Sequence, residues 1–193
     1  ATQASAFELY NENDVEASVN FFGQANGGAV LRSPGDASYG FTVPFARSKF
    51  SANWKDRADL NIQLDGAGGN VALLDMAVTL WPTDQIGVRM GRYKTSVSRE
   101  YLIGGPNLPF VGRALLNSFV PRRRIGAETV GKFDLGGLKL DAQVGLFQPG
   151  NSRFGFDNPQ GQLFNASVAA RLPVGLEFHA GYAQHVFGDN ARE

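Results

Sequence analysis

The chain has 193 residues, among them 24 Gly, 15 Phe and no Cys, and its 18 Lys and Arg balance its 18 Asp and Glu. A disulfide scaffold is impossible, two His leave too few ligands for a zinc framework, and the zero net charge gives no global argument for nucleic-acid binding. No apolar run approaches the ~20 residues of a transmembrane helix. A transmembrane β-barrel remains open, because its strands need only about 10 alternating residues.

Alternation of polar and apolar residues predicts an all-β chain of about nine strands. The clearest case is 59–65, where Leu60, Ile62 and Leu64 face one side and polar residues face the other. The predicted strands cover residues 13–25, 41–53, 58–66, 71–81, 86–94, 123–133, 138–148, 163–172 and 176–187.

The predicted connections fall into two classes that alternate along the chain. Short turns rich in Pro, Gly and Asp lie at 54–57, 82–85, 134–137 and 173–175, and mostly longer loops lie at 26–40, 67–70, 95–122 and 149–162. All short turns therefore lie at one end of an antiparallel up-and-down sheet. A transmembrane barrel has this asymmetry, and a soluble up-and-down barrel can have it too.

The periodicity alone does not say whether the apolar face meets lipid or a protein core. Three features favour lipid: a polar face that mixes amides and charges of both signs, Gly spread through the strands, and aromatic residues at strand ends. Those aromatics are Trp54, Trp81 and Phe133, with Trp81 one residue out of phase. With lipid outside, Arg47, Lys49 and Arg89 point inward, whereas Arg92 and Lys94 fall on the outer phase near a strand end.

The predicted loop 95–122 is basic, and it also carries many apolar residues that a solvent-exposed loop would not need. We expect it to fold into the lumen, where its arginines narrow the pore and attract anions. The alternative is an outer-surface loop whose arginines bind lipopolysaccharide phosphates or a neighbouring subunit. The candidate pore-lining, anion-binding residues are Arg47, Lys49, Arg89, Arg99, Arg113, Arg122, Arg123 and Arg124.

Several segments between residues 41 and 148 resemble the phosphate-selective porin O and P family. They are Val88-Arg89-Met90-Gly91-Arg92-Tyr93-Lys94, Tyr101-Leu102, the strand–turn–strand from Arg47-Ser48-Lys49 to Gly68-Gly69, Arg113-Ala114-Leu115-Leu116-Asn117, and Phe119-Val120-Pro121-Arg122-Arg123-Arg124-Ile125-Gly126.

The resemblance implies a trimeric, sixteen-stranded barrel in the bacterial outer membrane, with the third long loop folded into the channel. It also implies passive uptake of small anions or polar solutes, with outer-membrane lipid and other envelope subunits as partners. The chain is too short for sixteen strands. We therefore expect residues 1–193 to be a single but incomplete barrel domain, either the N-terminal part of a longer porin or a subunit closed by another chain.

Three alternatives to a channel are a closed barrel that binds a ligand, a structural envelope component and an enzyme. A closed eight-stranded barrel would need partners for Arg47, Lys49 and Arg89, which Asp59, Asp65, Asp75, Glu128, Asp141 and Glu177 could supply. Such a barrel could bind a small ligand, and a structural envelope component could dock other proteins. Catalysis is not expected, because His179 and His185 match no metal or triad spacing, and no cofactor is expected.

Overall fold

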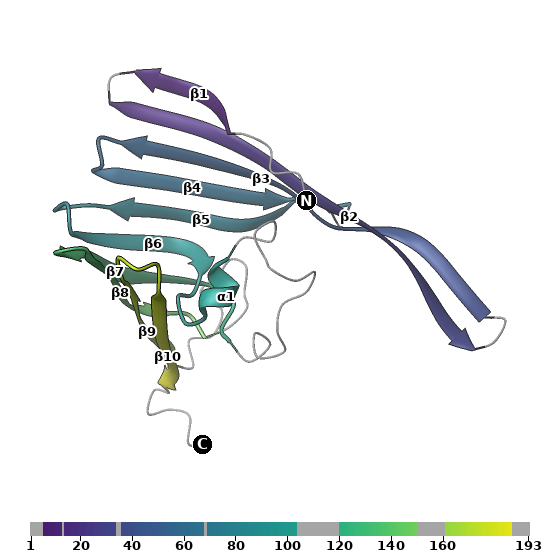
Figure 1. Ribbon diagram of the computed structural model, residues 1–193. Coiled ribbons are helices and arrows are strands. Elements are labelled where there is room, and N and C mark those ends of the chain that lie inside the picture. The colour runs from purple at the N-terminus through teal and green to yellow at the C-terminus, as the bar shows by residue number, and fades with distance from the viewer. Residues whose placement is uncertain are drawn as a thin grey trace.

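The computed structural model describes residues 6–12, 14–33, 36–67, 69–103, 120–149 and 161–186. These residues form one antiparallel sheet of ten strands that pair in chain order, from β1 at one edge to β10 at the other (Figure 1). The strands are β1 Phe7–Glu12, β2 Val15–Ser33, β3 Asp36–Trp54, β4 Ala58–Asp65, β5 Ala72–Leu80, β6 Ile86–Lys94, β7 Arg123–Leu135, β8 Leu138–Phe147, β9 Gln162–Arg171 and β10 Glu177–Val186.

One short helix, α1 Arg99–Leu102, follows β6. Its N-terminus is capped by Ser98, whose hydroxyl accepts a hydrogen bond from the backbone N–H of Tyr101. No helix among the described residues is long and apolar enough to cross a membrane.

The expected all-β, up-and-down architecture is confirmed, but the strand count was wrong by one. Residues Phe7–Glu12 pair with the start of β2 and add a strand at the edge of the sheet. The described strands also form an open sheet, in which β1 and β10 each pair with one neighbour, so the closed eight-stranded arrangement is not what the chain adopts.

The prediction of a loop at 26–40 was also wrong. Strands β2 and β3 continue through most of it and remain paired, with Asn26 opposite Thr42 and Gly28 opposite Gly40. Because β4 pairs with β3 only from Arg47 onward, this part of the hairpin is a two-stranded ribbon that projects beyond the sheet (Figure 1). Residues 27, 28, 39 and 40 of this ribbon are exposed, so they show none of the one-sided burial that produces the alternation by which a strand is recognised.

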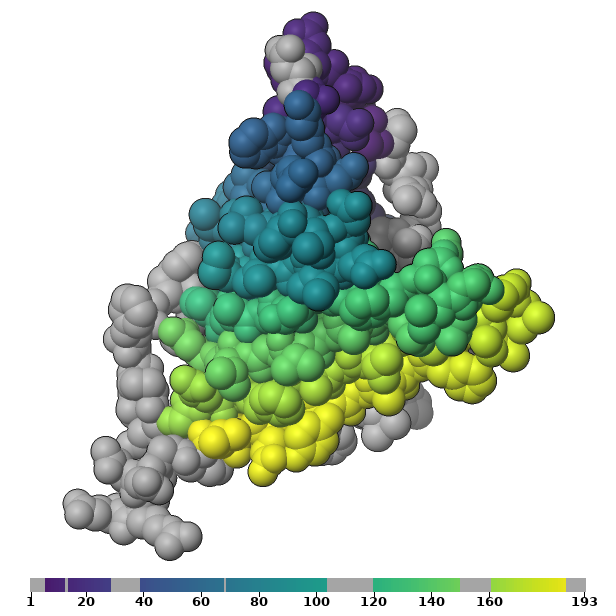
Figure 2. Space-filling view, turned by 90° about the vertical axis from the view of Figure 1, so that its left-hand side faces the viewer, coloured from purple at the N-terminus to yellow at the C-terminus, as the bar shows by residue number. Residues whose placement is uncertain are grey.

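The short turns lie together at one end of the sheet, as expected. Within the described residues, β3–β4, β5–β6, β7–β8 and β9–β10 are joined there by tight connections. Figure 2 shows this end, with the strands in chain order from purple to yellow. At the opposite end the β6–β7 connection begins, and the sheet curves around α1 (Figure 1).

Cross-strand partners separate the two faces of the sheet. One row runs Asp59, Thr79, Arg89, Glu128, Gly145, Asn165 and Ala183; the adjacent row runs Ala58, Leu80, Val88, Thr129, Val144, Ala166 and Tyr182. We call the face of the first row the inner face, because residues 96–99 lie against it, and the other the outer face.

Burial differs between the two faces: the inner face holds buried side chains, both polar and apolar, and the outer face leaves apolar side chains exposed. On the inner face, Thr79, Glu128 and Asn165 are 4%, 2% and 0% exposed. On the outer face, Val144 and Tyr182 are 51% and 54% exposed. The hydrophobic core of the described residues also lies on the inner face, as a cluster of Ala77, Tyr93, Phe147 and Leu163 in which Tyr93 packs edge-on against Phe147.

Candidate functional site

Ion pairs connect the strands across the inner face. Arg47 of β3 donates from Nε to Oδ2 of Asp65 at 2.7 Å, and Arg89 of β6 donates to Oε1 of Glu128 at 3.0 Å. Both acids lie opposite their arginines in the strand register. The Glu128 side chain is fully buried, whereas Arg89 keeps partial exposure. A buried carboxylate needs such a partner, because removing its charge from water is costly.

A longer pair spans three strands at the loop end. Arg123 begins β7, and its guanidinium contacts both carboxylate oxygens of Asp75 in β5, at 2.6 and 3.0 Å. Since β6 lies between β5 and β7, this bidentate pair ties the three strands together. Both side chains are largely buried.

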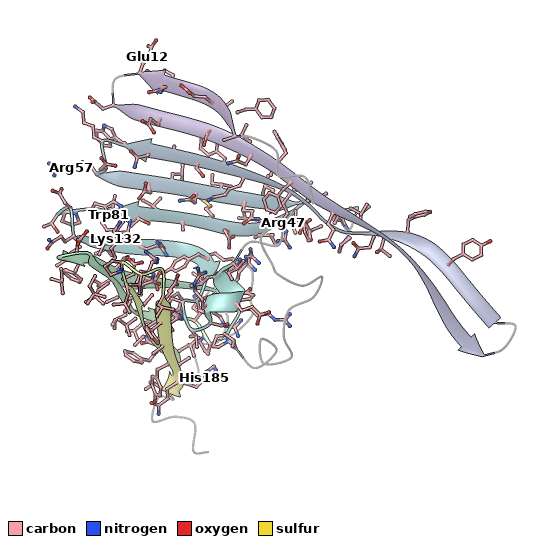
Figure 3. The ribbon with its side chains drawn as sticks, viewed as in Figure 1. Glu12, Arg47, Arg57, Trp81, Lys132 and His185 are labelled. Carbon is pink, nitrogen blue, oxygen red and sulfur yellow. The ribbon has the colours of Figure 1, made fainter. Side chains whose placement is uncertain are left out.

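At the turn end, the inner face carries a cluster around Trp81. The indole Nε1–H of Trp81 donates to Asp59 Oδ2 at 2.6 Å, and Lys132 Nζ lies 4.3 Å from the centre of the indole ring (Figure 3). The ring covers Gly87, where a Cβ atom would come within 2.7 Å of it. Trp81 therefore faces inward, and its expected place in an outer aromatic belt was wrong. Trp54, at the end of β3, is 58% exposed.

The start of the β6–β7 connection lies against the inner face of β9 and β10. The side chain of Asn165 donates to Ser96 Oγ at 2.8 Å, and both residues are buried. At Gly181 a Cβ atom would lie 2.1 Å from the carbonyl oxygen of Val97, so only glycine permits this approach. Arg99 of α1 donates to both carboxylate oxygens of Glu177, at 2.5 and 3.3 Å.

The two ends of this connection meet at its base. The backbone N–H of Thr95 donates to the carbonyl of Arg122 at 3.3 Å, and the Thr95 hydroxyl donates to the carbonyl of Pro121. The Thr95 side chain is fully buried. Residues 104–119 lie outside the described part of the chain, so the expected entry of the whole segment 95–122 into the lumen stays a prediction, as does the role of Arg113.

The remaining predicted site residues occupy different places. Arg47, Arg89, Arg99 and Arg123 are each paired with an acid, as described above. Lys49 lies on the inner face opposite Gln63, and Arg122 is exposed at the loop end. No acid within the described ranges lies at ion-pair distance from Lys49 or Arg122. Arg124 is half-buried, and one of its nitrogens donates to the carbonyl of Arg123.

The two basic residues on the outer phase find backbone partners. Arg92 donates from one terminal nitrogen to the carbonyls of Leu73 and Leu74, at 2.6 and 2.5 Å, and Lys94 donates to the carbonyl of Tyr101 at 2.9 Å. The acceptors of Arg92 lie at the start of β5, and the acceptor of Lys94 lies in α1.

Sequence reasoning named the acids but not the contact that holds residues 96–99 against the inner face. Of the six acids suggested as partners for Arg47, Lys49 and Arg89, two pair with them in the described structure, Asp65 with Arg47 and Glu128 with Arg89. Asp75, Asp141 and Glu177 pair instead with Arg123, Arg171 and Arg99. The contact between Ser96 and Asn165 was missed, because it joins residues 69 positions apart whose meeting depends on sheet curvature. The signal available in the sequence was that Asn165 falls on the inward-facing side of its strand.

Among the described residues, no group of three or more His, Asp or Glu side chains is arranged to hold a metal ion. His179 and His185 share the inner face of β10, in register with Ala169 and Leu163. No family model, curated protein or solved structure matches the chain. The described residues thus define an all-β protein with a single antiparallel up-and-down sheet.

Proposed function

We propose that this sheet is part of the wall of a bacterial outer-membrane porin, through which small anions or polar solutes diffuse passively. The observation that carries the proposal is the difference in exposure between the two faces. The outer face exposes Leu80, Val144 and Tyr182 in one row, while polar side chains on the other face are buried and hydrogen-bonded. An apolar surface of this kind is stable against hydrocarbon and unfavourable in water.

The open edges set a condition on this proposal. Unpaired backbone groups cannot face hydrocarbon, because no water is present there to satisfy them. Strands β1 and β10 each leave one edge unpaired among the described strands, so closure requires further strands, from this protein or from another copy. A barrel wider than ten strands would leave room for a water-filled passage, as in sixteen-stranded porins.

The ion pairs reduce the positive charge that we expect at the constriction. Arg47, Arg89, Arg99 and Arg123 each have an acidic partner, so they hold the wall together and add little net positive charge. Lys and Arg balance Asp and Glu among the described residues, so the positive charge at the passage is local and comes from positions such as Lys49 and Arg122, which have no described acid at ion-pair distance. We therefore propose a modest preference for anions with continued passage of neutral solutes, because weak sites allow release.

Recording in planar lipid bilayers tests this proposal. We expect the purified protein to form open pores with anions more permeant than cations, as judged by the reversal potential in a salt gradient. Replacing Lys49 and Arg122 with Ala lowers that preference, whereas Arg57→Ala, at the turn end, changes it less. A protein that forms no pores, or that is monodisperse in buffer without detergent, would contradict the proposal.

The projecting ribbon favours a second candidate, a structural role in which the barrel docks another envelope subunit. Tyr39 and Phe41 of β3 are 88% and 91% exposed in this ribbon. An isolated two-stranded ribbon is only marginally stable. If the ribbon docks a partner, Tyr39→Ser with Phe41→Ser reduces the mass of the detergent-solubilised complex and leaves conductance unchanged. An unchanged mass would remove this candidate.

A further inference from the structure

The start of the β6–β7 connection is attached to the inner face by two chemically different contacts. One is the neutral hydrogen bond between Ser96 and Asn165, which is buried. The other is the ion pair between Arg99 and Glu177, whose side chains are 49% and 26% exposed. The buried contact is insulated from solvent, whereas the ion pair is open to screening by salt.

Glu177 is shared between the connection and the wall. Its carboxylate accepts both hydrogen bonds from Arg99, and Arg171 Nε of β9 lies 3.6 Å from Oε2 of the same group. Arg171 has a second partner, Asp141 of β8, at 2.5 Å. Glu177 is the only acid within ion-pair distance of Arg99 among the described residues. Loss of Glu177 would therefore leave Arg171 paired and Arg99 unpaired.

We propose that Glu177 is a positioning residue, which holds residues 95–103 against the β9–β10 part of the wall and thereby keeps the Arg99 charge neutralised there. The inference deepens the proposed channel function and rests on it for its consequence. With Glu177 in place, the four charges of Arg99, Arg171, Asp141 and Glu177 cancel. Without it, α1 loses its ionic contact and the passage gains one positive charge beside β10.

A spin label on α1 tests the positioning directly and without reference to conductance. The chain has no Cys, so Leu102→Cys, at an exposed position of α1, gives a single labelling site in the full chain folded in detergent. The comparison is between Glu177→Gln and Glu16→Gln. Glu16 belongs to β2 and, like Glu177, lies on the inner face, opposite Asn53. It makes no ion pair with any described residue.

We expect Glu177→Gln to shorten the rotational correlation time of the label about two-fold or more, and Glu16→Gln to leave it unchanged. High ionic strength of about 1 M weakens ion pairs that are exposed to solvent, so it should mobilise the label in the unaltered chain and have little further effect in Glu177→Gln. Arg99→Gln should match Glu177→Gln, and the double variant should add little, as for a direct pair. Near-ultraviolet circular dichroism checks that each variant is folded.

A label that is equally mobile in all these variants would overturn the positioning role, whatever the conductance. In bilayers, Glu177→Gln should shift the reversal potential toward anions by more than Glu16→Gln, and equal shifts would overturn its effect on the charge of the passage. Absence of any conductance in the unaltered chain would instead count against the proposed function, because the label measurement does not depend on it.

Discussion

At the scale of single residues, the inner face is organised by acids that pair with arginines on neighbouring strands. The phase of the alternation placed Arg47, Arg89 and Glu128 inward, and the structure agrees. The pairing of Arg123 with Asp75 could not be predicted in the same way. It depends on the register of β5, β6 and β7, which local sequence does not specify.

The pair between Arg89 and Glu128 should be important for stability. Arg89→Met leaves the fully buried Glu128 side chain without its charged partner, and we expect a loss of about 3 kcal/mol in the free energy of unfolding. Urea unfolding of the detergent-folded protein, followed by tryptophan fluorescence, measures this loss.

The matched control is the double variant Arg89→Met with Glu128→Leu, which removes both charges. It should be more stable than Arg89→Met alone, because no buried charge is left unpaired. A double variant that is less stable than the single one would contradict this assignment.

At the scale of elements, strands that pack on one side were predictable and the projecting ribbon was not. Strands β5 to β9 alternate because residues on one of their faces are buried. In the ribbon, Gly27, Gly28 and Gly40 resemble loop residues, since no burial acts on either face. Contacts between the β6–β7 connection and β10 were also beyond sequence reasoning, because they depend on how strongly the sheet curves.

Gly181 tests the packing of that connection. In Gly181→Val the new side chain would meet the Val97 carbonyl oxygen, which lies 2.1 Å from the Cβ position, so residues 97–102 must move away from β10. We expect their backbone amides to exchange hydrogen at least about tenfold faster. Gly28→Val is the control, because nothing lies within 4 Å of its Cβ position. Unchanged protection of residues 97–102 would show that they do not rest on β10.

At the scale of the whole molecule, the two faces of the sheet are assigned to different solvents. The sequence showed one apolar and one polar face, but either could have been the buried one. The structure buries Glu128 and Asn165 and leaves Val144 exposed, and this is the observation behind our proposal of lipid outside and water within. The sequence could not decide this, because periodicity is the same in both orientations.

The two tryptophans report on this assignment from opposite faces. Trp54 is exposed on the outer phase, whereas Trp81 is buried on the inner face beside Asp59. In vesicles made with lipids brominated near the headgroup end of the acyl chain, Trp81→Phe, which keeps Trp54, should show strong quenching of fluorescence. Trp54→Phe, which keeps Trp81, should show weak quenching. Stronger quenching of Trp81 than of Trp54 would contradict the assignment.

Cysteine scanning along β8 tests the orientation most directly. In this strand Asp141 and Gln143 face inward, and Ala142 and Val144 face outward. Each is replaced singly by Cys in vesicle-reconstituted protein and treated with a small, charged, water-soluble thiol reagent. We predict rapid reaction at 141 and 143 and protection at 142 and 144. Rapid reaction at 142 and 144 with protection at 141 and 143 would contradict the account.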